Sequence, residues 1–186
     1  MESQISLSFD LGTNGIPHFC PEDDKQYRSF SALQLPEQIS SIPALEGMAE
    51  LETLIREMVL PTSTLKPLRC EANLLSKKDR PNIAFHKSHL IFCFSRPEAN
   101  HAKIKYEQFF HCFSEFLSAK SLPQELVIEF KIIYTLFRVE GFNGYSVDFK
   151  VCGYGESPDK ARQIANIGYA HFRKFIAEDD IKYNFR

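Results

Sequence analysis

The sequence predicts an α+β domain in which two β-hairpins form an antiparallel sheet and amphipathic helices pack on one face of that sheet. Two observations support this prediction. Three stretches carry apolar residues at three- and four-residue spacing, which is typical of amphipathic helices, and stretches rich in β-branched and aromatic residues alternate with them. The 186 residues are 44% apolar and 25% charged, so the chain is long enough and apolar enough to bury a core.

Prolines divide the first 44 residues into short pieces. Ile5, Leu7 and Phe9 alternate with polar residues, as in a half-buried strand, but four X-Pro pairs follow before residue 44. Each proline lacks a backbone N–H donor, which restricts it to edge strands and turns. We therefore expect residues 1–44 to form an irregular segment with short edge strands, and residues 45–186 to form the α+β domain.

The first helix is predicted over residues 45–60, where Pro61 ends a run of apolar residues at helical spacing. A hairpin follows this helix. One strand is predicted over residues 68–75 and a longer one over 83–94, with a charged turn between them at 76–81.

The second helix is predicted over residues 101–119, between Pro97 and Pro123. Asn100 precedes it and is expected to cap its first turn, because an amide oxygen can accept a hydrogen bond from an unpaired helical N–H. Its apolar face is strongly aromatic, with Ile104, Phe109, Phe113, Phe116 and Leu117.

A second hairpin is predicted over residues 126–155, and its first strand begins in the β-branched and aromatic stretch 126–139. We expect a three-residue turn over 142–144, in which Gly144 takes the left-handed position of a bulge-type turn. This register sets apolar residues opposite apolar residues and a cation opposite an anion. The predicted pairs are Phe137 with Phe149, Val139 with Val147, and Arg138 with Asp148.

The last helix is predicted over residues 157–177. Ser157 is a good N-cap, Pro158 suits the first helical position, and Asp159 suits the positive end of the helix dipole. Small residues in its apolar stripe are expected to let it lie close to a sheet. That stripe contains Ala161, Ile164, Ala165, Gly168, Phe172, Phe175 and Ile176. Two strand-strand-helix units result, over 68–119 and 126–177.

Gly153, Gly155 and Ser157 form a G-x-G-x-S turn into this last helix, and that turn resembles the C-terminal part of a double-stranded-RNA-binding domain. The matching residues form a G-x-G-x-S turn followed by a helix: Gly153, Gly155, Ser157, Ala161, Arg162 and Ala165. The resemblance implies an α-β-β-β-α order from the 101–119 helix onward. However, Pro158-Asp159 stands where that family has two phosphate-contacting lysines. The resemblance therefore implies a divergent domain that binds protein rather than RNA.

Residues with metal-binding or catalytic chemistry are scattered. His86 and His89, with Cys93 nearby, are in a predicted strand, where alternation sends positions 86 and 89 to opposite faces. His111 and Cys112 are adjacent on a predicted helix and point about 100° apart, which does not suit a thiolate and its base. We expect no catalytic residue, no metal site and no cofactor.

We expect a non-enzymatic interaction protein that binds a protein partner, or a second copy of itself as a homodimer, through a sheet edge or an aromatic helix face. The 17 Phe and 7 Tyr residues indicate a large aromatic surface. The five cysteines form no C-x-x-C pair, and the N-terminus has no apolar signal, so we expect a cytoplasmic protein. No apolar run is long enough to span a membrane.

Two alternatives stay open. The first is binding of structured RNA, because residues 1–60 carry three basic and ten acidic side chains, which leaves the rest of the chain basic. Its candidate contacts come from the first hairpin and the last helix: Lys77, Lys78, Arg80, Lys87, Lys160, Arg162, Arg173 and Lys174. The second is a small chaperone or adaptor, because the mixed pattern with an acidic start resembles small secretion-chaperone folds that dimerise and hold an unfolded client.

Overall fold

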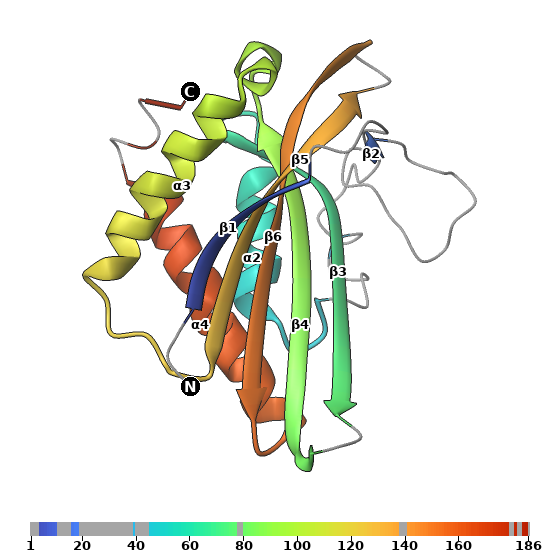
Figure 1. Ribbon diagram of the computed structural model, residues 1–186, viewed down its shortest axis with the longest axis vertical. Helices are drawn as coiled ribbons and strands as arrows, with labels where there is room; N and C mark the ends of the chain where they lie inside the picture. Colours follow the sequence, from blue (N-terminus) through green and yellow to red (C-terminus); the bar gives the residue numbers. More distant parts are fainter. Residues whose placement is uncertain are drawn as a thin grey trace.

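A computed structural model describes residues 4–10, 16–18, 39, 45–77, 80–137, 141–178, 181 and 184–185. It confirms the α+β class: a six-stranded, mostly antiparallel sheet carries helices on one face (Figure 1). Within these residues, no helix is both long and apolar enough to cross a membrane.

The sheet has the strand order β1-β5-β6-β4-β3. β3 (Leu65–Lys77) pairs antiparallel with β4 (Arg80–Phe94), and β5 (Leu126–Phe137) pairs antiparallel with β6 (Phe142–Gly155). Antiparallel pairing of β6 with β4 joins these two pairs at the centre of the sheet. β1 (Gln4–Asp10) and the short β2 (Ile16–His18) both run parallel to β5, so the N-terminal part of the chain adds one border of the sheet.

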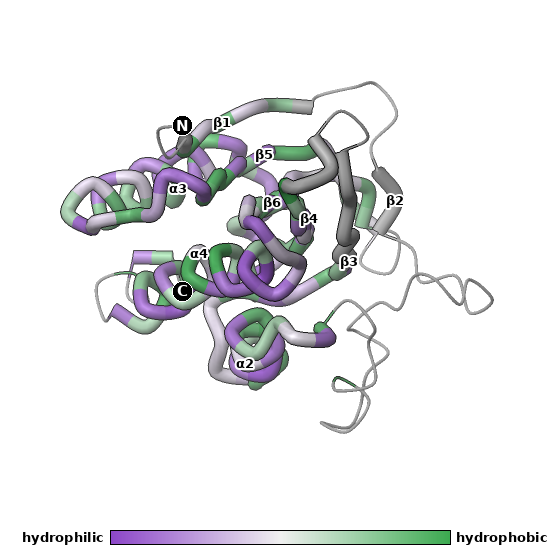
Figure 2. The backbone as a smooth tube through the Cα atoms, turned by 90° about the horizontal axis from the view of Figure 1, so that it is seen from below, coloured by the Kyte–Doolittle hydropathy of each residue, from purple (hydrophilic) through white to green (hydrophobic). Residues whose placement is uncertain are grey.

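The helices α2 (Ala49–Met58), α3 (Lys103–Ser118) and α4 (Pro158–Ala177) cover one face of the sheet (Figure 2). The core lies between these helices and the strands. Its centre is aromatic: Phe92 of β4 and Phe149 of β6 meet Phe172 of α4 at ring-centroid distances of 5.5 and 4.4 Å. Along most of β5, buried and half-buried residues alternate, as expected when one face is covered, whereas residues 146–149 of β6 are all buried.

The start of α4 confirms the predicted N-cap and first helical residue. The N–H of Lys160 donates to Ser157 Oγ at 3.2 Å, and Pro158 is the first helical residue. The helix lies very close to β6, because a Cβ on Gly153 would be only 2.1 Å from the carbonyl oxygen of Ala161. Only glycine permits this approach.

The second helix differs from its prediction at its start. A 3-10 turn, η3 (Pro97–His101), precedes α3, and Ala102 rather than Asn100 occupies the N-cap position. Asn100 is buried and bonds the backbone of Phe94 instead. Ile104 was predicted in the apolar face, but its side chain is 56% exposed.

The predicted register of the β5–β6 pair is wrong. Phe137 lies opposite Phe142, and Phe149 lies opposite Phe130. Gly141, with φ of 75°, takes the left-handed position that was predicted for Gly144. Arg138 and Val139 lie outside the described residues.

The observed register has a physical reason that extends along both strands. It pairs Ile132 with Val147, and on the other face it pairs Glu129 with Lys150. Apolar and opposite-charge pairs thus alternate where residues 128–132 face 147–151, whereas the prediction weighed only the pairs nearest the turn.

Candidate interaction surface

The face of the sheet that is turned away from α2, α3 and α4 carries a network of charged side chains across neighbouring strands. Lys150 of β6 donates to Glu129 of β5 at 3.0 Å, and Ser8 of β1 donates to the same carboxylate at 3.0 Å. On the other side, His89 Nδ1 of β4 lies 3.0 Å from Asp148 Oδ1, and Lys150 Nζ lies 3.8 Å from Asp148 Oδ2. Four strands are linked in this way.

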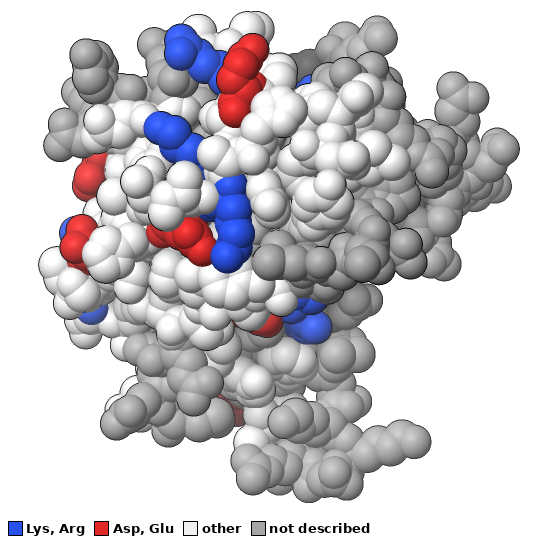
Figure 3. Space-filling model, turned by 45° about the horizontal axis from the view of Figure 1, so that its top comes forward, with Lys and Arg blue, Asp and Glu red and all other residues white. Residues whose placement is uncertain are grey.

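These contacts hold the charges in fixed pairs. Burial alone would raise the pKa of Glu129, but the hydrogen bonds from Lys150 and Ser8, together with the Lys150 charge, outweigh it and lower that pKa below its ordinary value. On the face seen in Figure 3, blue Lys and Arg side chains lie beside red Asp and Glu side chains rather than forming a continuous basic patch. The charges visible on that face are of mixed sign.

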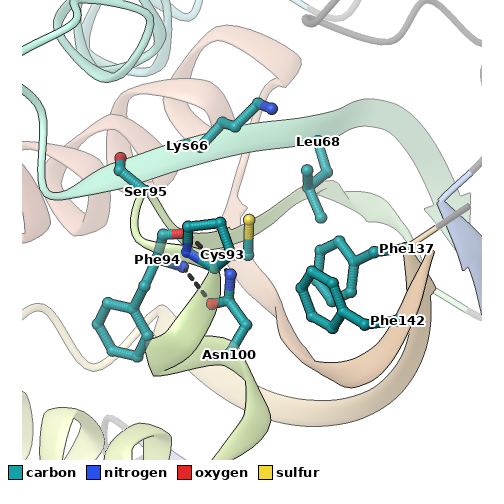
Figure 4. Close-up of a pocket in the computed structure, with 9 residues that line it drawn as sticks. Lys66, Leu68, Cys93, Phe94, Ser95, Asn100, Phe137 and Phe142 are labelled. Atoms are coloured by element: carbon teal, nitrogen blue, oxygen red, sulfur yellow. Dashed lines mark hydrogen bonds between the residues drawn. The ribbon is translucent and has the colours of Figure 1, made fainter. Parts of the chain in front are cut away.

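A second apolar cluster lies at one end of the sheet, formed by Leu68, Cys93 and Phe137 with Ile91 and Phe142 packed against them. It borders a small hollow of about 60 Å³ (Figure 4). The rings of Phe137 and Phe142 stack there at 4.6 Å. Ligand pockets usually have volumes of about 300–1,000 Å³, so this hollow suits a side chain rather than a cofactor.

The outermost strands, β1 and β3, have no strand partner on their outer sides within the described part of the chain. In β3 a bulge separates Pro67 from Arg69, and beyond it the strand advances one residue per pair with β4 as far as Ser76. At β1, Phe9 is 45% exposed and Lys103 Nζ of α3 lies 4.0 Å from the centroid of its ring. These two strands are therefore candidate interaction edges.

The aromatic face of the second helix, predicted as an interaction surface, lies in the core. Phe109 and Phe113 are fully buried, with Phe172 and Phe175 of α4 among their ring neighbours. The prediction overestimated the exposed aromatic surface because rings from two helices and three strands pack into one layer. Of the two predicted surfaces, the aromatic face of α3 is mostly buried, and the sheet edge stays a candidate.

Among the cations predicted to bind RNA, those whose side chains the structure describes lie on α4 and on β4. On α4, Arg173 donates to Glu57 and Glu50 of α2 at 2.6–3.0 Å, while Lys160 and Lys174 are exposed. Hydrogen bonds from Arg173 to Glu57, opposed by burial but assisted by Glu50, raise the pKa of its guanidinium. These bonds fasten α2 to α4.

The remaining predicted cations lie elsewhere. Arg162 is ion-paired with Asp159. Lys87 follows the buried His86 in β4, so strand alternation directs it to the face away from α4. Lys78, and the side chains of Lys77 and Arg80, lie outside the described residues.

Sequence reasoning missed the charged network on the sheet. Its signal was the alternation of Glu129 with Lys131 and of Asp148 with Lys150 inside apolar strands, but only the correct β5–β6 register brings these residues opposite one another. His86 and His89 do lie on opposite faces, as expected. No group of three His, Cys, Asp or Glu side chains placed to hold a metal ion occurs among the described residues.

Comparisons with protein-family models, with curated proteins and with solved structures found no match to this chain. The resemblance of the 153–165 turn and helix to a double-stranded-RNA-binding domain stays a prediction. Between α3 and α4 the described chain has the two strands β5 and β6, whereas the α-β-β-β-α order of that family has three.

Proposed function

We propose that this chain is a protein-binding domain that pairs an outer strand of its sheet with an extended segment of another polypeptide. The observation that carries the proposal is β3, a 13-residue strand at one border of the sheet. An outer strand offers a row of backbone donors and acceptors, and domains that bind peptides by strand addition use such a row for affinity.

The segment of β3 from Glu71 to Ser76 is the best candidate for this contact. It pairs regularly with residues 84–89 of β4, and the extra residues at the hairpin end belong to β4 rather than β3. Natural sheets usually protect such borders with bulges or prolines, and here Pro67 and its bulge lie at the other end of the strand. A six-residue extended segment is long enough for one added strand of ordinary length.

The charges also favour protein over RNA as the partner. Arg173 and Arg162, two of the predicted phosphate contacts, are engaged with carboxylates, and Lys150 on the sheet is held between Glu129 and Asp148. Affinity for RNA depends on cations that are available to replace counterions around phosphates.

Selection from a displayed library of random ten-residue peptides tests the proposal. Two matched variants, Ala72→Pro and Asn73→Pro, locate the contact, because neighbouring residues of an antiparallel strand direct their N–H groups alternately toward and away from the partner strand. The variant with the smaller loss of thermal stability is the one that lost an outward N–H. It is expected to bind selected peptides at least tenfold more weakly, whereas Phe9→Glu at the opposite border binds them as the wild type does.

The proposal is wrong if no peptide is enriched over background. It is also wrong if selected peptides bind the outward proline variant with wild-type affinity.

A further inference from the structure

The border formed by β1 exposes apolar side chains. Phe9 is 45% exposed and Ile104, at the start of α3, is 56% exposed, and these are two of the four large apolar side chains exposed in the described part of the chain. The ammonium group of Lys103, the first residue of α3, lies over the Phe9 ring at 4.0 Å, so the start of α3 lies near β1 at this point. The exposed part of Phe9 therefore lies at the border of the sheet, close to the start of α3.

The sequence of β1 is symmetric about Leu7. Ile5 and Phe9 stand two residues to either side, and Ser6 and Ser8 stand one residue to either side. Ile5 and Leu7 pack against the core between sheet and helices, whereas Ser8 bonds Glu129 on the opposite face. The strand thus carries an apolar row on one face and hydroxyl groups on the other.

We propose that β1 pairs antiparallel with β1 of a second copy of this chain, with Leu7 on the twofold axis. The proposal rests on the proposed use of outer strands for binding and names the partner of this border. Leu7 then lies opposite Leu7 of the second copy, Ile5 opposite Phe9, and Ser6 opposite Ser8. Every apolar residue meets an apolar residue, which is what a stable cross-strand pairing requires.

Other registers fit less well. A slip by one residue would set Ile5 opposite Ser8 and mix the two faces along the whole strand. In the symmetric register the one charged residue of the strand, Asp10, falls opposite Gln4, so no carboxylate meets a second carboxylate. Charge and apolar pattern select the same arrangement.

The geometry of the fold permits this pairing. A twofold axis perpendicular to the sheet keeps the helices of both copies on the same side and joins the sheets into one. In Figure 1, α3 lies on the same border of the molecule as β1, so the pairing brings the α3 helices of the two copies toward each other.

The contact between the two β1 strands is small. Seven residues span about 23 Å of strand at roughly 3.3 Å per residue, and the exposed Phe9 and Ile104 of both copies add to the area. Such a contact falls at the low end of the roughly 1,200–2,000 Å² that specific interfaces bury. We therefore expect a dimer that dissociates on dilution.

Sedimentation velocity of the full chain over a hundredfold concentration range tests the proposal. The wild type is expected to shift from monomer to dimer, whereas Phe9→Glu and Ile104→Glu weaken the association at least tenfold. Leu60→Glu is the matched control, because Leu60 is 54% exposed just beyond α2 and its substitution changes charge and apolar area in the same way. It is expected to dimerise as the wild type does.

Thiol cross-linking tests the register. Ser6→Cys and Ser8→Cys chains are expected to form a disulfide-linked dimer when mixed and oxidised, because these positions lie opposite each other in the proposed pair. Each variant alone should give no more cross-linked product than the wild type, whose native thiols set the background.

A wild type that stays monomeric throughout the range overturns the inference, as does a dimer that Phe9→Glu leaves intact. If that dimer is instead weakened by the outward proline variant of β3, self-association uses the other border. The inference about β1 then fails while the proposed strand-pairing function stands.

Discussion

The side chain of Asn100 completes the hydrogen bonding of Phe94 at the end of β4. Its Oδ1 accepts from the N–H of Phe94 at 2.9 Å, and its Nδ2 donates to the carbonyl of Phe94 at 3.0 Å. The β4–β6 pairing stops at Phe92, so the amide takes the place of a partner strand. Tyr106 also lies 2.6 Å from the Asn100 oxygen, which ties α3 to the same point.

We therefore expect Asn100→Leu to lower the free energy of unfolding by about 2–4 kcal/mol, because it removes both hydrogen bonds of the amide to the buried backbone of Phe94. Asn100→Asp is the matched variant. The aspartate keeps an acceptor for the Phe94 N–H but has no amide donor for the Phe94 carbonyl. The decrease in the free energy of unfolding should therefore be smaller than for Asn100→Leu. Urea unfolding measures both, and equal stability of Asn100→Leu and wild type would contradict the role assigned to the amide.

Gly153 and Gly141 are required for different reasons: close packing of α4 on β6 at Gly153, and a left-handed backbone at Gly141. A Cβ on Gly153 would lie 2.1 Å from the carbonyl oxygen of Ala161, so Gly153→Ala must push α4 away from β6. Gly141 has φ of 75° but no atom within 4 Å of its Cβ position. We expect Gly141→Ala to cost about 1–2 kcal/mol from its left-handed backbone alone. Gly153→Ala should cost clearly more, and thermal unfolding of the two variants side by side checks the order.

Arg173 is expected to stabilise the fold rather than to contact RNA. Its guanidinium joins Glu50 and Glu57 of α2 to α4, and its side chain is 28% exposed. Arg173→Gln should lower the free energy of unfolding by about 1–2 kcal/mol, within the usual range for a partly buried pair. Lys174→Gln changes the neighbouring exposed cation and should change the free energy of unfolding by less than about 0.5 kcal/mol. Equal effects of the two substitutions in urea unfolding would contradict this assignment.

The buried His86 predicts a loss of stability in acid. Neither ring nitrogen has a hydrogen-bond partner among the described residues, and burial, with a further effect of the Arg162 charge, lowers the pKa of the imidazole below 6.5. As the pH falls through about 6.5, the unfolded chain takes up a proton that folded His86 does not. The unfolded state then binds more protons, so the free energy of unfolding should fall, with a slope of at most about 1.4 kcal/mol per pH unit from this group.

This pH dependence is checked by urea unfolding at pH 7.5 and 5.5. His86→Phe removes the titrating group and should reduce the difference between the two pH values. The control is His111→Gln, at a side chain that is 76% exposed, which should leave the difference unchanged. If His86→Phe keeps the full difference, another group is responsible.

The parts of the fold that depend on residues adjacent in the sequence could be predicted. Ser157 and Pro158 mark the start of α4 through local hydrogen bonding and a fixed backbone angle. The role of Asn100 could not be predicted in the same way, because its partner is the end of a strand rather than the first turn of a helix. The sequence signal of an amide before a helix is the same in both cases.

Contacts between distant parts of the chain were harder to predict. Parallel pairing of Ile5 with Ile128 joins residues more than 120 positions apart, and no short pattern near β1 specifies it. Likewise, the exposure of Phe9 and the burial of Phe109 depend on which helix covers which part of the sheet. The candidate interaction edges follow from that arrangement, so composition alone could not choose between a sheet edge and an aromatic helix face.

Amide hydrogen exchange along β3, at residue resolution, tests the central claim most directly. In the chain at low concentration, alternate residues of Glu71–Ser76 should exchange rapidly, because their N–H groups point away from β4. Addition of a selected peptide should protect those same amides and leave the inward ones unchanged. Outward amides that are already protected in the chain alone, or that still exchange rapidly when the peptide is bound, would contradict binding by strand addition at this border.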